Sequence, residues 1–245
     1  MVRFFGLVLA FAATISSANA ALLVSYNFDE SLSKGPLPPA PGVAAAASDG
    51  QFGQSDTFGG TAVAAVNAGT TSQGRTESFY IAPSEANSFI LLSSLSFDAK
   101  RTYNATTTTG TLRTVLASLG LNIGNPILGD NGEIGLLADP IASGFQAATS
   151  VPAASYTVSP LLTTSLTSTF QTFTVTFNNP LKIDANKILR TNLSLTGAAN
   201  GTTGVQTVYQ LDNVNFYGTV VPEPSSMAVF GLLSVGAMVR RIRRK

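Results

Sequence analysis

The stretch Ser168-Thr-Phe-Gln-Thr-Phe-Thr-Val-Thr-Phe177 (STFQTFTVTF) decides the fold. Apolar Phe173, Val175 and Phe177 alternate here with threonines at positions 172, 174 and 176. Successive side chains of a β-strand point to opposite faces of the sheet. The period of two therefore predicts a strand with one face in a core and a hydroxyl-rich face outward. The segment 178–180 (Asn-Asn-Pro) is expected to end this strand, because proline cannot donate to a strand ladder.

Similar but shorter patterns flank this stretch on both sides. The segment 35–42 is rich in proline and is expected to be irregular or polyproline-like, and 122–144 is rich in turn residues. Four alanines at 44–47 fit a helical turn. Short strands without an amphipathic helix predict an all-β fold, an antiparallel β-sandwich with a jelly-roll order preferred. The predicted strands are 21–28, 78–81, 88–100, 111–119, 168–177, 188–196 and 205–219.

The N-terminus is typical of a secretory signal peptide over residues 1–20. Arg3 provides a positive start, and Phe4–Ile15 is almost wholly apolar. Ala18 and Ala20 place small residues where a signal peptidase accepts them, which predicts cleavage before Ala21. The alternative is a permanent N-terminal anchor, but this apolar run is short against the roughly 20 residues of a membrane-spanning helix.

The C-terminus consists of three consecutive blocks over residues 221–245. The first is Val221, Pro222, Glu223, Pro224 and Ser225, and the second is the uncharged segment 226–239. The second block predicts a short transmembrane helix, and the basic end is expected to stay cytoplasmic. An ordinary tail anchor is the alternative, although an uncharged block of 14 residues is marginal for a stable span. The basic cluster within residues 240–245 consists of Arg240, Arg241, Arg243, Arg244 and Lys245.

This order of blocks resembles the PEP-CTERM sorting signal of Gram-negative bacteria. The resemblance implies export across the inner membrane and at least transient anchoring by the C-terminus. It also implies recognition by an exosortase, a membrane cysteine enzyme thought to cut near the Pro-Glu-Pro motif. The destination would be the cell surface or the extracellular space. Proteins of this kind usually come from species that build exopolysaccharide or biofilm.

The composition of the predicted exported domain, residues 21–220, excludes several classes of function. It holds eight cationic and twelve anionic side chains, a balance of about −4, which argues against nucleic acid as a partner. The chain has no cysteine and no histidine. It therefore lacks a thiol nucleophile, the commonest general base and the commonest zinc ligand. These absences predict a protein without catalytic residues and without a cofactor.

The exported domain also resembles, more loosely, the jelly-roll domains common among PEP-CTERM proteins. The matching pieces are 95–100 (LSFDAK), 170–173 (FQTF) and 211–214 (LDNV). Related sandwiches include carbohydrate-binding modules, in which an aspartate near the last strand often helps to hold a structural calcium ion. The resemblance thus implies a metal site of Asp212 with Asp29, next to Glu30 near the first strand. The alternative is that Asp212 caps a strand or turn.

Three functions remain open from the sequence. The first is a non-catalytic surface or extracellular-matrix protein associated with exopolysaccharide or biofilm. The second is a carbohydrate-binding or glycosidase-like domain, although no recognisable carboxylate pair or catalytic motif occurs. The third is binding of ice or another surface through threonines at 106–109 and on the outer face of 168–177, although no internal repeat would build a regular grid.

The predicted signal peptide can be tested directly. We expect the exported protein to begin at Ala21, because Ala18 and Ala20 fit the signal peptidase pocket. N-terminal sequencing of protein recovered from the cell surface measures this. A sequence that starts at Met1 would contradict cleavage.

Overall fold

A computed structural model describes residues 20–26, 28, 37–47, 53–54, 62–66, 73–103, 114–125, 146–197 and 207–223. Within these ranges the chain consists of β-strands with one short 3-10 turn, η2 (Ala153–Ser155). The strands are β1 (Ala21–Tyr26), β2 (Val43–Ala47), β3 (Gly53–Gln54), β4 (Ala62–Val66), β5 (Gln73–Pro83), β6 (Ser88–Tyr103), β7 (Val115–Asn125), β8 (Gln146–Ser150), β9 (Tyr156–Ser159), β10 (Gln171–Ile183), β11 (Ile188–Gly197) and β12 (Thr207–Pro222).

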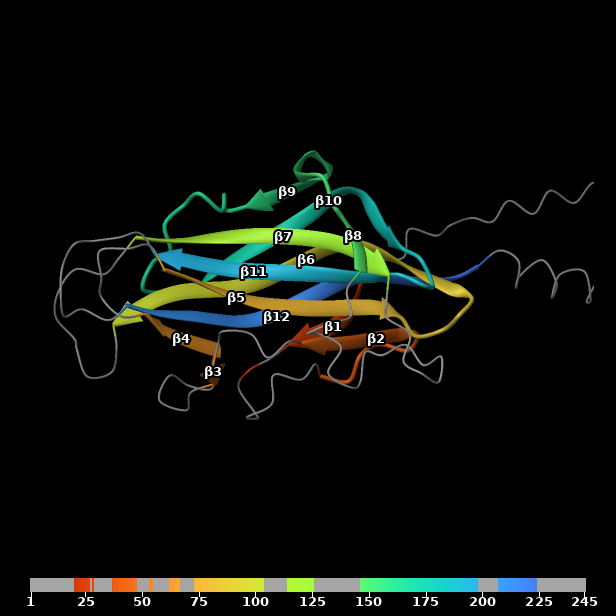
Figure 1. Cartoon of the computed structure of the whole chain (residues 1–245), viewed down its shortest axis with the longest axis horizontal. Helices are drawn as coiled ribbons and strands as arrows, with labels where there is room; N and C mark the ends of the chain where they lie inside the picture. The colour runs from red at the N-terminus through yellow and green to blue at the C-terminus, as the bar shows by residue number, and fades with distance from the viewer. Residues whose placement is uncertain are drawn as a thin grey trace, which may run out of the picture.

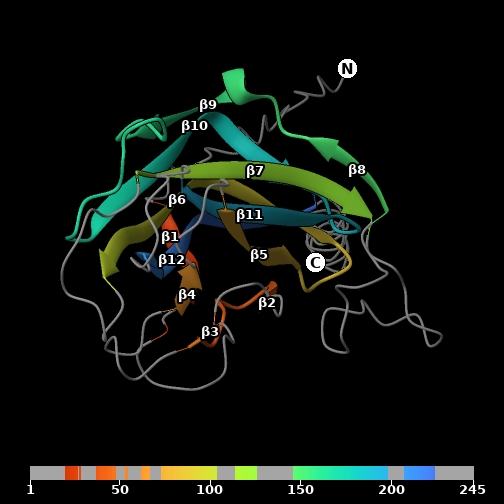
Figure 2. The same cartoon turned by 60° about the vertical axis from the view of Figure 1, so that its left-hand side comes forward.

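The described strands form two antiparallel sheets packed face to face, which confirms the predicted β-sandwich. One sheet has the order β3-β4-β12-β6-β10-β9, with β1 also paired to β12, and the other has the order β2-β5-β11-β7-β8. Along the chain, the long strands β5, β6, β7, β10, β11 and β12 alternate between the two sheets. Figures 1 and 2 show β5, β11 and β7 lying across β6 and β12. We call the first sheet, which holds β12, the β12 sheet.

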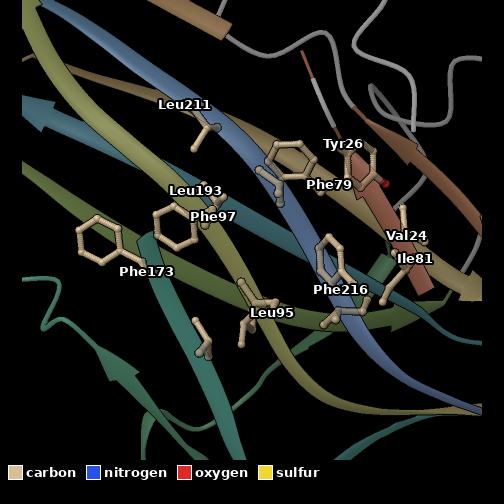
Figure 3. Close-up of a cluster of buried hydrophobic side chains, with 14 of the residues drawn as sticks. Val24, Tyr26, Phe79, Ile81, Leu95, Phe97, Phe173, Leu193, Leu211 and Phe216 are labelled. Carbon is tan, nitrogen blue, oxygen red and sulfur yellow. The ribbon is translucent and has the colours of Figure 1, made fainter. Parts of the chain in front are cut away.

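The core lies between the inner faces of the two sheets and is rich in aromatic residues. Tyr26 packs edge-on against Phe79 of the opposite sheet, with ring centroids 4.8 Å apart. Phe97 and Phe173 stack within the β12 sheet at 5.0 Å. Figure 3 shows these rings converging with aliphatic side chains from several strands. Burial of this apolar surface is the main force holding the two sheets together.

The alternation in the central sequence stretch is confirmed. Phe173 and Val175 are fully buried and Phe177 is 6% exposed, whereas Thr172, Thr174 and Thr176 face solvent. Strands are also confirmed within six of the other predicted segments: 21–28, 78–81, 88–100, 111–119, 188–196 and 205–219.

Two predictions of local structure were wrong. The alanines at 44–47 form strand β2, which pairs with β5, and not a helical turn. Alanine favours helices in isolation, but the neighbouring strand edge and the core contact of Val43 favour the extended form. Residues 122–125 of the segment predicted to be rich in turns belong to β7, and residues 126–144 lie outside the described residues.

The segment 178–180 does not end its strand, which is a third correction. Strand β10 continues to Ile183, but its register against β6 shifts between Thr176 and Leu181. In this irregularity four residues of β10 lie opposite a single residue of β6. Pro180 therefore sits where the ladder is already interrupted, and its missing N–H costs no sheet hydrogen bond.

Glycine is required at position 218, where the pairing of β12 with β6 has its second register shift. Gly218 follows a shift between Tyr217 and Gly218. A Cβ atom at this position would overlap the carbonyl oxygen of Leu91 and lie 3.0 Å from Leu23 Cδ1. The close approach of the two backbones therefore leaves no space for a side chain.

We expect Gly218→Ala to lower the free energy of unfolding by about 1–3 kcal/mol, because overpacking forces the backbone of β12 away from β6. Gly120→Ala in β7 is the matched control, since its added Cβ would find its nearest atom at 3.6 Å, an ordinary contact. Chemical denaturation of both variants measures the difference. Equal stability of the two variants would contradict the close approach at Gly218.

Candidate functional site at the end of strand β12

Strand β12 is the structural element that leads into the predicted sorting tail. It pairs with β6 from Thr207↔Tyr103 to Pro222↔Ser88, with two register shifts on the way. On its other side it pairs with β4 and β1. The strand that carries the tail is therefore held on both sides over most of its length.

The first residues of the predicted sorting motif belong to this strand. Val221 pairs with Phe89 and Pro222 pairs with Ser88. The backbone N–H of Glu223 then donates a 2.8 Å hydrogen bond to the carbonyl oxygen of Asn87. Val221 and Pro222 are therefore extended, and the sheet continues two residues beyond residue 220.

The register explains why proline fits at position 222. In an antiparallel pair, hydrogen-bonded and non-hydrogen-bonded positions alternate. Because Glu223 donates to Asn87, Pro222 opposite Ser88 occupies a non-hydrogen-bonded position. Its backbone nitrogen points away from β6, so the missing N–H removes no bond of this ladder.

The turn between β5 and β6, residues 84–87, supports this end of β12. The N–H of Ser84 donates to the carbonyl oxygen of Gly42 at 3.0 Å, and Ser88 Oγ donates to the carbonyl oxygen of Glu85 at 3.1 Å. Gly42 has a positive φ of 82°, and an added Cβ would meet Val220 Cγ1 at 2.9 Å. The turn is thus bonded to Gly42, and Gly42 lies against Val220 next to the motif. We call the turn, Gly42 and Val220 together the connected support of the motif.

The other predicted tail and signal residues lie mostly outside the described residues. This holds for Ala18, Pro224, Ser225, the segment 226–239 and the basic cluster. Ala20 is described and exposed, and it directly precedes β1. In the part of the chain that the structure describes, no helix has the length and apolar character needed to cross a membrane.

Asp212 lies at the other register shift of β12, directly opposite Asp98 of β6. Asn213 connects the two carboxylates, since its backbone N–H donates to Asp212 Oδ1 at 2.8 Å and its Nδ2 donates to Asp98 Oδ2 at 2.9 Å. Asn213 adopts a positive φ of 48°, a conformation that asparagine tolerates better than most residues. Sequence reasoning missed Asp98 and Asn213, because their proximity depends on the β6–β12 register.

The pair of carboxylates fits part of a calcium site. Asp212 is 5% exposed, and two carboxylates provide the oxygen ligands that Ca²⁺ prefers. The predicted second ligand, Asp29, and its neighbour Glu30 lie outside the described residues. Within the described ranges, no three or more Asp, Glu, His or Cys side chains are grouped so that they could hold a metal ion. The calcium site therefore remains a prediction.

Polar side chains, most of them with a hydroxyl group, gather on the outer face of the β12 sheet. The register aligns Ser159, Thr174, Ser96 and Asn215 across four strands, and Thr157, Thr176, Ser94 and Tyr217 in the next row. We call these eight residues the hydroxyl face. Among the described residues, the side-chain hydroxyls of this face have no side-chain hydrogen-bond partner.

The outer face of the opposite sheet is arranged differently. Ser78 Oγ donates to Asn192 Oδ1 at 2.7 Å, and the hydroxyls of Thr76 and Ser194 bond at the same distance. Tyr80 on this face is 5% exposed, and burial raises the pKa of its phenol above the usual 10.0. These polar groups largely satisfy one another, so the hydroxyl face has more unused bonding capacity.

Together these features define the exported part as a two-sheet β-sandwich whose last strand enters a C-terminal sorting segment. The PEP-CTERM protein-sorting motif matches residues 220–245. The motif implies export, processing by an exosortase and a cell-surface destination. The match begins inside β12, at a residue paired with Ile90 of β6.

Two solved structures are similar to this chain in part. One is a carbohydrate-binding module described for specific mannan recognition, with 12% identity over 82% of this chain and 99% of that chain, at a TM-score of 0.35. The other is the CBM3a-L domain with flanking linkers from the cellulosome scaffoldin of Clostridium thermocellum, with 12% identity over 66% and 88% and a TM-score of 0.26. A comparison with curated proteins finds no match.

If calcium binds beside Asp212, removing it will lower the melting temperature, because the bound ion stabilises only the folded state. Asp212→Ala is expected to abolish the difference between melts with calcium and with chelator. Asp184→Ala is the matched control: Asp184 lies in a half-exposed ion pair with Lys182, which contributes little. Identical wild-type melts with and without chelator would contradict the calcium site.

Proposed function

We propose that this protein is a non-catalytic surface or matrix protein that associates with exopolysaccharide. The single observation that supports this best is the hydroxyl face on a domain whose last strand runs into a cell-surface sorting motif. Sorting brings the domain to the surface, and the hydroxyl face provides a broad area for binding polymer there. Phe4–Ile15 would act as the signal sequence and the segment 226–239 as the transient membrane helix.

The chemistry of the hydroxyl face suits a polysaccharide. Thr157, Ser159, Thr174 and Thr176 are exposed, and each hydroxyl both donates and accepts. Sugar hydroxyls have the same dual capacity, so many weak hydrogen bonds can form along a chain. Aromatic surface lies at the margin: Phe170 is 37% exposed, with Lys100 Nζ 4.1 Å from its ring centroid. A sugar ring stacks on such a side chain.

The charge of the exported domain is compatible with this role. Its balance of about −4 is modest, and a neutral or weakly acidic polymer would meet little repulsion. The absence of histidine and cysteine from the chain supports binding over catalysis. A carbohydrate-binding-module-like role is a narrower form of the same proposal.

A second candidate is binding of ice or another surface through the threonines of the same face; the threonines at 106–109 lie outside the described residues. The direct pairing of Thr176 with Thr157, beside Thr174, places threonines on adjacent strands. Threonine is also a favoured outer-face residue of ordinary strands, so this arrangement alone distinguishes nothing. Measuring thermal hysteresis of the purified protein separates the two candidates.

The proposal is tested with full-length protein in detergent and exopolysaccharide from the native host, by affinity electrophoresis. We expect the double variant Thr174→Val, Thr176→Val to bind about fivefold more weakly or worse, since it removes two hydroxyls without changing side-chain volume. The control is Ser118→Ala with Thr196→Val on the exposed outer face of the other sheet. No retention of the wild type, or equal loss in both double variants, would contradict the proposal.

A further inference from the structure

The sorting motif begins within the folded sandwich and not after it. Val221 and Pro222 are paired with β6, and Glu223 is hydrogen-bonded to Asn87. Only Pro224 and Ser225 separate Glu223 from the apolar block at 226–239. At 3.8 Å per residue, the Cα atoms of Glu223 and Ser226 lie at most about 11 Å apart. When the apolar block is in the membrane, the sandwich is therefore held close to the membrane surface.

A peptidase binds the residues around its scissile bond in an extended form and makes its own hydrogen bonds to their backbone. The peptide bonds of β12 up to and including Pro222–Glu223 belong to a backbone that is already hydrogen-bonded to β6 and to the turn before it. Cleavage there would require β12 to separate from β6. The connected support formed by the 84–87 turn, Gly42 and Val220 opposes this separation.

We propose that the folded sandwich sets the position of tail removal, so that the scissile bond lies on the C-terminal side of Glu223. This inference rests on the exosortase processing that the motif implies, and not on polysaccharide binding. The exosortase thiol would attack the carbonyl carbon of that bond, the C–N bond would break, and the tail would leave as a free amine that takes up the proton. Water, or another nucleophile of the cell envelope, then releases the domain from the thioester.

The proposal has a structural consequence for the enzyme. It must reach the motif in the narrow space between the membrane and this end of the sandwich. The turn residues Ser84, Glu85, Ala86 and Asn87 are exposed and adjoin Glu223. The exosortase would therefore work beside this turn.

The first test measures the position of the cut in the native host. Mass spectrometry of the surface protein is expected to show a C-terminus at Glu223 or later. In a variant with Gly-Ser-Gly-Ser inserted between Val220 and Val221, the motif is intact but detached from β6. Its processing is expected to become several-fold faster, with additional C-termini upstream of Glu223.

The same insertion between Ser225 and Ser226 is the matched control. It lengthens the connection to the membrane but leaves Val221 to Glu223 on the sheet, so the C-terminus is expected at the wild-type position. A wild-type C-terminus between Val220 and Pro222 would overturn the proposal. So would an unchanged processing rate and cut position in the first insertion.

A second test does not depend on the exosortase. Full-length protein in detergent is digested with a protease of broad specificity, and the resistant fragment is weighed. We expect it to end at Glu223 or within a few residues after it, because paired backbone resists cleavage. A resistant fragment trimmed to residue 220 or earlier would overturn the proposal, even if the host removes the tail.

Discussion

The pairing of β12 with β6 is the interaction on which the rest of the structure depends. These are the two longest strands, and their ladder runs from Thr207↔Tyr103 to Pro222↔Ser88. The ladder brings Phe97 and Phe216 into one core with Phe79 of the other sheet. Its two register shifts create the Asp98–Asp212 position and the close approach at Gly218. Its last pair lies inside the sorting motif.

This arrangement joins the folded sandwich directly to the start of the sorting motif. In the folded chain Pro222 is paired with Ser88 and Glu223 is bonded to Asn87, whereas a chain whose β12 has not paired would present both residues as free peptide. Proline suits position 222 for two reasons. The register directs its backbone nitrogen away from β6, so no hydrogen bond to β6 is lost. On the opposite edge of β12, the missing N–H discourages the pairing of another strand. The motif is thus compatible with both a strand end and an extended enzyme substrate.

Much of the fold could be predicted from the sequence, because alternation such as that of 172–177 depends only on strand geometry and burial. Strands β8 and β9 could not, since they are only five and four residues long, too short for a pattern to stand out from the surrounding loops. At Pro180 and at the alanines 44–47 the local propensity predicts the wrong structure, because pairing with neighbouring strands overrides it. The burial of Glu77 could not be predicted from the sequence either. This side chain is fully buried, and its residue pairs with Leu193 of β11. The sorting motif could be recognised from its residues. The hydrogen bond from Glu223 to Asn87 could not be predicted, because it depends on the register between strands that are distant in the sequence.

The Glu223 amide is bonded to the end of the folded sheet. Hydrogen exchange of the full-length protein, resolved at single residues, tests this most directly. We predict that the Glu223 amide exchanges many times more slowly than in an unstructured peptide of the same sequence, because it donates to the Asn87 carbonyl oxygen. Exchange at the rate of the free peptide, while the amides of β6 and the rest of β12 remain protected, would contradict the account.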